Sequence, residues 1–177
     1  MRQLLTVFST VEDVLGNKSV FTHTHPSMYL IADSRQTAWI EVAPGGRFSI
    51  RTTKRGVLTH TNHYLDETLV NMNGKIGWSS RTRLGRIGEL LESRKAPLTL
   101  EDFIAFAQDR NDGPDNSLWR TGSKPDGNRT LASWIVSLPP AAPPDLFVRL
   151  VNPGEPERTM RMTLDGSFWK RMDEWIF

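Results

Sequence analysis

The order of local patterns along this chain limits its fold more than any other feature. Its first third contains four short runs that are rich in β-branched and aromatic residues. Asp-Ser, Pro-Gly-Gly and Lys-Arg-Gly separate these runs, and such residues suit tight turns between neighbouring strands. The pattern therefore predicts an antiparallel meander. Its expected strands are residues 28–32, 37–43, 47–52 and 57–60.

Three other segments repeat their apolar residues with the spacing of a helix. Each is preceded by a Ser or Thr that can accept a hydrogen bond from the first free backbone N–H groups. In one of them an Asp three residues later completes a capping box. The expected helices are a short one within 6–16 that begins after Thr10 and ends at Gly16, then 82–94 behind Ser79 or Ser80, and 100–108 behind Thr99 with Asp102.

Strand character returns after a loop expected at 109–129, which is rich in Asp, Asn, Gly and Pro. Strands gathered on either side of a pair of helices favour an α+β fold, with helices packed on one or more antiparallel sheets. The length of 177 residues suits one domain, residues 1–177, with its own core. The later expected strands are 130–138, 146–151 and 159–164.

Composition excludes several classes of function. The formal charge is +2, and the basic residues are scattered, so neither nucleic acid nor a membrane surface is expected as a partner. No apolar stretch reaches the roughly 18 residues of a membrane span, and the polar N-terminus does not resemble a signal peptide. A cytoplasmic protein is therefore expected. The chain has no cysteine, which excludes disulfides and a cysteine nucleophile from its own residues.

Two polar clusters carry the candidate chemistry. Asn62 directly follows the expected strand 57–60, where its side-chain NH2 group can stabilise negative charge on a carbonyl oxygen. Alternatively, Asn62 bonds its own backbone in a turn. Arg83 offers a permanently charged guanidinium that can orient a carboxylate, or it is one more solvated basic residue.

In their wider context these clusters resemble a known family. The segments that carry the resemblance are Leu30–Asp33, Trp39–Val42, Gly56–Tyr64, Ser80–Arg86, Asn116–Arg120, Arg129–Ile135 and Leu146–Arg149 with Asn152–Pro153. Together they are similar to the penicillin acyltransferase-like branch of the N-terminal nucleophile hydrolases, which are relatives of choloylglycine hydrolases and act on linear amides. The resemblance implies an αββα architecture, here incomplete.

The resemblance also implies roles for individual residues. The asparagine of the family's Thr-Asn-His motif lines the oxyanion hole, which points to Asn62, with His63 in support. A Ser-x-x-Arg element supplies an active-site arginine, which points to Arg83, with Arg81 as the alternative choice and Ser80 in support. Family members use a new N-terminal cysteine and an aspartate from an upstream region. This chain looks like the C-terminal portion, so catalysis would need a fragment that carries the nucleophile.

Two classes of function follow as hypotheses. The first is an amide hydrolase or acyltransferase that works with a nucleophile from elsewhere. The second is a non-catalytic remnant that binds ligands or forms oligomers. Either one predicts a small acyl or amide ligand and no cofactor. A sheet without its upstream strands would expose an edge, which predicts a homo-oligomer.

The histidines and tryptophans need separate consideration. A zinc site would require imidazoles from both histidine clusters, but their spacing suits ligation poorly, so turn or surface positions are expected instead and no metal. The residues concerned are His23, His25, His60 and His63. Trp39 and Trp134 fall in expected strands and are predicted in the core, whereas Trp78 is a candidate wall of an acyl pocket.

Overall fold

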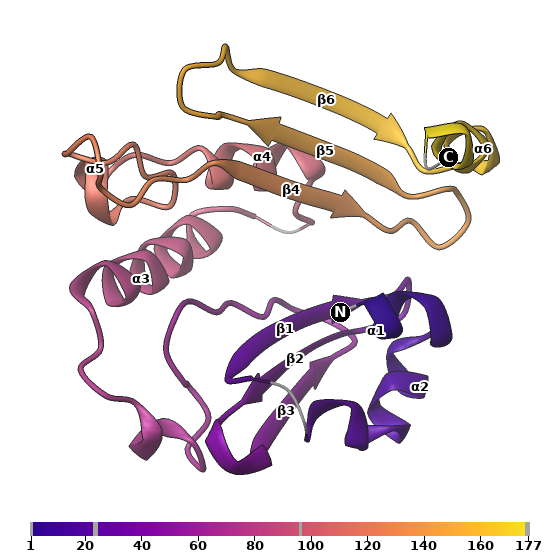
Figure 1. Ribbon diagram of the computed structural model, residues 1–177, viewed down its shortest axis with the longest axis horizontal. Helices are drawn as coiled ribbons and strands as arrows, with labels where there is room; N and C mark the ends of the chain where they lie inside the picture. Colours follow the sequence, from indigo (N-terminus) through magenta and orange to yellow (C-terminus); the bar gives the residue numbers. More distant parts are fainter. Residues whose placement is uncertain (1, 23–24, 96, 176–177) are drawn as a thin grey trace. The chain divides into compact units, whose positions relative to one another are not determined.

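The first part of the chain builds a three-stranded antiparallel sheet in the computed structural model, which describes residues 2–22, 25–95 and 97–175. The strands are β1 (Ser27–Ala32), β2 (Thr37–Val42) and β3 (Phe48–Thr53), with β2 in the centre (Figure 1). The β1–β2 turn is held by the carboxylate of Asp33, which accepts hydrogen bonds from the backbone N–H groups of Arg35 and Gln36. These strands confirm three of the four runs expected in this region.

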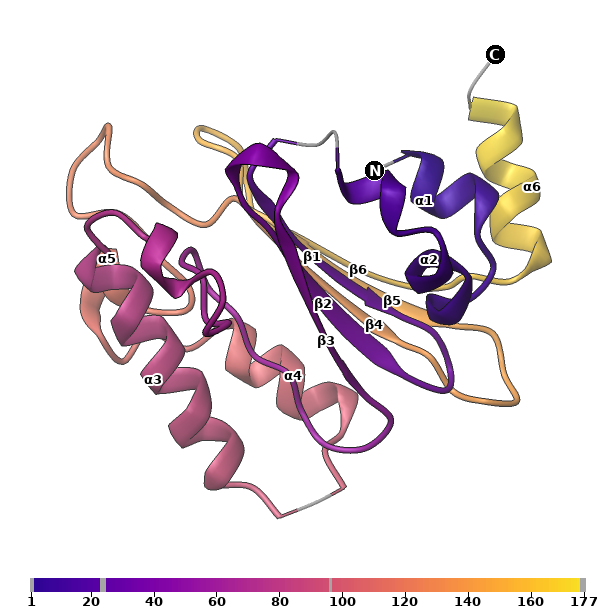
Figure 2. The same ribbon diagram turned by 90° about the horizontal axis from the view of Figure 1, so that it is seen from below.

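One face of this sheet forms the core of the first unit. Alternate residues of β2, Ala38, Ile40 and Val42, are fully buried on that face together with Phe21. The helices of residues 2–7 and 11–16 lie on one face of the sheet (Figure 2). Thr10 begins a helix, as predicted, and the structure adds a capping box between Thr10 and Asp13. The helical elements of this region are α1 (Arg2–Val7), α2 (Val11–Gly16), and the short 3-10 turns η1 (Lys18–Phe21), η2 (Pro44–Gly46) and η3 (Val70–Met72).

The opposite face of β2 carries Trp39 and Glu41, which are 2% and 0% exposed. The period of two in a strand places these side chains away from the helices. His60, from the polypeptide that follows the sheet, packs its ring edge against Trp39 at a centroid distance of 5.5 Å. Burial of this second face of β2 therefore depends on residues beyond the last strand.

The prediction of a strand at 57–60 is wrong. After β3 the chain turns at Gly56, which adopts a positive φ of 99°, and residues 57–60 form no strand. The polar groups that follow are bonded to a side chain instead of a neighbouring strand: His60 and the backbone N–H of Leu65 both meet the carboxylate of Glu41. A short apolar run could not reveal this, because its burial arises from a long-range contact.

The second part of the chain begins with helices. Their bounds are α3 (Trp78–Glu92), α4 (Leu100–Ala107) and α5 (Gly113–Asn116). The capping box of Thr99 and Asp102 is confirmed. The expected cap of α3 is wrong, because Gly77 occupies that position and the Ser79 hydroxyl donates to the carbonyl of Asp115 at 2.9 Å. The helix α5 also interrupts the loop predicted at 109–129.

A second antiparallel sheet follows, with the order β4 (Ala132–Ser137), β5 (Asp145–Leu150) and β6 (Arg158–Thr163), and then α6 (Gly166–Trp175). The helix α4 contacts β4, and its Glu101 forms an ion pair with Arg161 of β6 at 3.0 Å. Arg161 and Trp134 point to opposite faces of this sheet, by the register of the strands. Trp134 is 69% exposed, so its prediction as a core residue is wrong, whereas that for Trp39 is confirmed.

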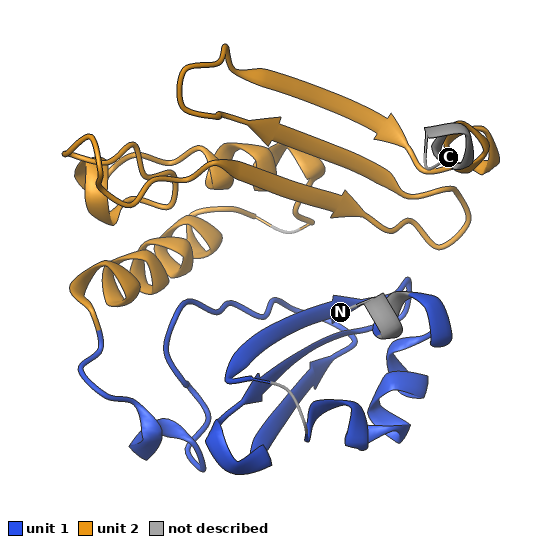
Figure 3. Ribbon diagram, viewed as in Figure 1, with its two compact units in different colours: residues 1–76 blue, residues 77–177 orange. Residues whose placement is uncertain are grey.

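The two antiparallel sheets and their helices confirm the α+β class. The chain divides into two units, residues 1–76 and 77–177 (Figure 3), and each is described here by itself. The single domain expected from the sequence stays a prediction. Among the described residues, no helix combines the length and the apolar character that a membrane span requires.

Candidate functional site

A pocket of about 500 Å³ lies in the first unit, next to the buried end of β2. This volume falls in the range of pockets for small ligands, roughly 300–1,000 Å³. Its walls come from the start of β1, from Glu41 of β2, and from two segments that follow the sheet. The lining residues are Pro26, Ser27, Met28, Glu41, His60, Thr61, Asn62, His63, Tyr64, Met72, Asn73 and Gly74.

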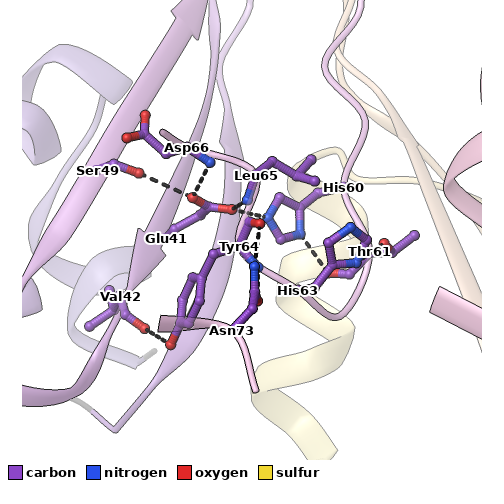
Figure 4. Close-up of polar contacts among 10 residues, drawn as sticks. All are labelled: Glu41, Val42, Ser49, His60, Thr61, His63, Tyr64, Leu65, Asp66 and Asn73. Atoms are coloured by element: carbon purple, nitrogen blue, oxygen red, sulfur yellow. Dashed lines mark hydrogen bonds and ion pairs between the residues drawn. The ribbon is translucent and has the colours of Figure 1, made fainter. Parts of the chain in front are cut away.

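Glu41 is the most deeply buried charged group of this site. It sits in a strand between Ile40 and Val42, and its side chain has no exposed surface. Four donors surround its carboxylate (Figure 4). Oε1 accepts from Nε2 of His60 at 2.6 Å and from the backbone N–H of Leu65 at 2.6 Å; Oε2 accepts from the backbone N–H of Asp66 at 3.0 Å and from the Ser49 hydroxyl at 3.3 Å.

His60 joins Glu41 to the segment that carries the predicted site residues. Its side chain is 5% exposed. The ring meets the Glu41 carboxylate through Nε2 and the carbonyl oxygen of Thr61 through Nδ1, at 2.5 Å. The strand β2 and residues 60–66 are therefore tied together by side-chain contacts rather than by a ladder of strand hydrogen bonds.

Other side chains of residues 60–66 also make hydrogen bonds. The Tyr64 hydroxyl donates to the carbonyl of Val42 at 3.2 Å. Thr61 Oγ1 lies 3.2 Å from Nδ1 of His63. Asp66 turns its own carboxylate toward Thr68, and hydrogen bonds from that residue lower the pKa of Asp66. These contacts involve side chains on both sides of Asn62.

The structure places two of the predicted site residues at the pocket. Asn62 is exposed and His63 is half-buried, and both belong to the pocket wall. An exposed amide beside a pocket is accessible to a ligand, whereas the neighbouring polar groups of His60 and Glu41 are buried. Asn62 can therefore contact a ligand, while His60 and Glu41 support the segment that carries Asn62.

The remaining predicted residues lie in the second unit, on α3. Ser80 is buried, Arg81 is exposed and Arg83 is half-buried. Partial burial lowers the pKa of Arg83, and the nearby positive charge of Arg120 lowers it further. The Nε of Arg83 lies 3.4 Å from the Ser79 hydroxyl. That Asn62 and Arg83 share one cavity stays a prediction.

Trp78, the expected wall of an acyl pocket, is 73% exposed at the start of α3 and is absent from the lining of the pocket described here. Of the histidines weighed for a metal, His25 is exposed and His23 lies outside the described residues. Within residues 2–22, 25–95 and 97–175, no three His, Cys, Asp or Glu residues form a cluster that could hold a metal ion.

Sequence reasoning missed Glu41 as a part of the site. Its signal was present: one carboxylate stands inside the run Ala38–Ala43, where its five neighbours are all apolar. An acid in a strand that is buried on both faces needs hydrogen-bond donors from elsewhere in the fold. His60 was considered only as a strand residue or a metal ligand.

Comparison with known proteins supports the family resemblance seen in the sequence. A family model described as acyl-coenzyme A:6-aminopenicillanic acid acyl-transferase matches residues 1–153. The match covers most of the chain, which therefore belongs to this acyltransferase family, whose fold is of the N-terminal nucleophile type. A search of curated proteins finds no match.

Proposed function

We propose that this chain forms part of an enzyme that hydrolyses a small linear amide or transfers its acyl group, with Asn62 as the hydrogen-bond donor to the reacting carbonyl oxygen. The observation that carries the proposal is the position of Asn62: its exposed amide lines a pocket of about 500 Å³, on a segment anchored to a buried carboxylate. Membership of the acyltransferase family supports it.

In the proposed reaction, Asn62 stabilises the oxyanion. A nucleophile adds to the carbonyl carbon of the amide, and the carbonyl oxygen becomes negatively charged. The NH2 group of Asn62 donates a hydrogen bond to this oxyanion, which lowers the barrier when the donor is held in place beforehand. The C–N bond then breaks, the amine leaves with a proton, and the acyl group passes to water or to an acceptor amine.

The nucleophile is not a cysteine of this chain, because its 177 residues contain none. We assign that role to a thiol from a segment or polypeptide outside these residues, with its own α-amine as base, as the family resemblance implies. The sulfur bonds to the carbonyl carbon in the first step, and the acyl–sulfur bond breaks in the second. Asn62 serves both steps, since each passes through an oxyanion.

The lining of the pocket favours a neutral ligand. Among its described lining residues there is no lysine or arginine, and the carboxylate of Glu41 already has four donors. Met28, Met72 and Pro26 add apolar surface for an acyl chain. The active-site arginine that the family resemblance implies is Arg83 on α3, where partial burial and the nearby charge of Arg120 lower its pKa.

Reconstitution tests the proposal. The chain is mixed with a family fragment that begins with the catalytic cysteine, and release of amine from octanamide is measured. We expect turnover by the mixture and by neither part alone. Asn62→Ala should lower kcat by about 10²- to 10³-fold, whereas Asn71→Ala, an exposed asparagine of the same unit, should leave it unchanged. Equal activity of Asn62→Ala and Asn71→Ala would contradict the role of Asn62.

A second candidate function is ligand binding without catalysis, which the lack of any cysteine favours. In this case the pocket holds an acyl amide and releases it unchanged. Calorimetry of the lone chain with octanamide distinguishes the two functions when it is combined with the turnover assay. Saturable binding that Asn62→Ala weakens, with no turnover in the presence of the cysteine fragment, would support the binding function.

A further inference from the structure

We propose that Glu41 is a positioning residue: its buried carboxylate, paired with a doubly protonated His60, holds residues 60–66 and thereby the amide of Asn62 in one conformation. The structural part of this inference stands on the contacts of the first unit alone. Its catalytic consequence rests on the proposed function of Asn62.

The contacts of the carboxylate connect two parts of the chain. Glu41 belongs to β2, and three of its four donors, from His60, Leu65 and Asp66, belong to the segment beyond the sheet. They lie on both sides of Asn62 in the sequence. A single carboxylate therefore closes a loop of the backbone, with Asn62 inside that loop.

The hydrogen-bond partners of His60 identify its protonation state. Nε2 faces a carboxylate oxygen and Nδ1 faces a backbone carbonyl oxygen, and a carbonyl can only accept. With a carboxylate of Glu41 as the other partner, both ring nitrogens donate, which is the doubly protonated ring of this proposal. Two backbone N–H groups and one hydroxyl also donate to the same side chain.

The burial of this pair makes it a rigid support. The side chains are 0% and 5% exposed, so water competes little for either partner. Loss of the charge on Glu41 would leave the N–H groups of Leu65 and Asp66 facing a weaker acceptor. A donor to an oxyanion contributes most when its position is set before the reaction, and the pair provides this for Asn62.

The first experiment uses the unaltered chain. Long-range 1H–15N NMR correlations of the imidazole rings are recorded at pH 7, with His60 assigned by comparison with His60→Gln. We expect the pattern of a ring protonated on both nitrogens. A neutral ring with one unprotonated nitrogen would overturn the proposal, and this outcome does not depend on any activity.

The second experiment compares Glu41→Gln with Glu67→Gln by amide hydrogen exchange. Glu67 is an exposed carboxylate one residue beyond the segment. In Glu41→Gln, exchange of the Leu65 and Asp66 amides should accelerate about tenfold or more, while amides of the α2 helix stay unchanged. In Glu67→Gln all of them should match the unaltered chain. Unchanged exchange of Leu65 and Asp66 in Glu41→Gln would refute the role of Glu41.

A further variant tests the same ion pair if Glu41→Gln does not fold. His60→Gln removes the positive partner and leaves the carboxylate in place. Exchange of the Leu65 and Asp66 amides should then rise at least about threefold, and an unchanged rate would count against the ion pair. In the reconstituted enzyme, Glu41→Gln should lower kcat about tenfold with a smaller change in KM. Lack of turnover in every mixture would refute the proposed function and leave the exchange result intact.

Discussion

Tyr64 and Asn73 exchange two hydrogen bonds across the pocket wall. The backbone N–H of Tyr64 donates to Oδ1 of Asn73 at 2.8 Å, and Nδ2 of Asn73 donates to the carbonyl of Tyr64 at 2.9 Å. The side chain of Asn73 thus bonds both backbone groups of Tyr64, as a neighbouring strand would in a sheet. This pair fixes the backbone two residues after Asn62, where no strand is present.

Replacement of Asn73 tests this pair. Asn73→Ala leaves the N–H and C=O groups of Tyr64 without their partner, and each half-buried polar group that loses a hydrogen bond is destabilising. We expect the free energy of unfolding to fall by about 1–3 kcal/mol in urea denaturation. The control, Asn71→Ala, should stay within about 0.5 kcal/mol of the unaltered chain. Equal stability of the two variants would contradict this role.

A second prediction concerns Arg86 and Asp109 in the other unit. Arg86 donates to both carboxylate oxygens of Asp109, at 2.8 to 3.2 Å. These hydrogen bonds lower the pKa of Asp109, although burial opposes the shift. A carboxylate whose pKa is lower in the folded state stabilises the fold above its unfolded pKa, and this contribution disappears as the pH falls through the folded value.

The pH dependence of unfolding measures this contribution. At pH 7, Asp109→Asn should lower the urea midpoint relative to the unaltered chain. The difference should begin to shrink below about pH 4, where Asp109 of the unfolded chain takes up a proton, and should vanish as the pH falls through the lower pKa of folded Asp109. Asp126→Asn, at an exposed position, serves as control and should show no such trend. A difference that is constant from pH 7 to pH 3 would argue against the pair.

The third prediction separates two arginines on α3. The urea midpoint of Arg83→Gln measures what this arginine contributes to the fold, including its contact with the Ser79 hydroxyl at 3.4 Å. In the reconstituted assay the same variant should lower turnover at least about tenfold, because a charge that directs the substrate is lost. Arg81→Gln, at an exposed position, should change neither quantity. A loss of stability without loss of turnover would make Arg83 structural.

The fourth prediction follows from the second sheet. Trp134, Val136 and Met160 are 69%, 47% and 40% exposed, and the strand register places all three on one face. Exposed apolar patches commonly mark contact surfaces, which supports the homo-oligomer expected from the sequence. Light scattering should give a mass above the 20.1 kDa of one chain, and Trp134→Ser should lower it. A monomeric mass for the unaltered chain would contradict this expectation.

Local signals were sufficient for much of the fold. The helix starts at Thr10 and Thr99 were predicted from their local sequence, and at Thr99 the acid three residues later also predicted the capping box. The six strands found were all expected to within two residues at each end. Alternating apolar residues and turn sequences provide this information locally.

Features that depend on distant contacts were not predicted correctly. Residues 57–60 have the composition of a strand, but their surroundings are set by Glu41, about twenty positions earlier in the sequence. Ser79 was expected to cap a helix, yet its hydroxyl bonds the carbonyl of Asp115. Trp134 was placed in the core, because a strand pattern alone does not tell which face a helix covers.

The candidate site was predictable in part, for the same reason. The motif around Asn62 is local, so the sequence suggested Asn62 and His63, and both line the pocket. Their roles in catalysis stay predictions. Glu41 was missed because its role depends on donors that come from a later segment. The isolated acid in an apolar strand was the signal that could have identified it.

A crystal structure of the chain with bound octanamide would show whether Asn62 meets the carbonyl oxygen of a ligand. We expect the amide to occupy the pocket, with its carbonyl oxygen about 2.7–3.1 Å from Nδ2 of Asn62 and with Glu41 and His60 still in contact. An amide bound elsewhere, or bound in the pocket with its carbonyl oxygen turned away from Asn62, would refute the proposed role of Asn62.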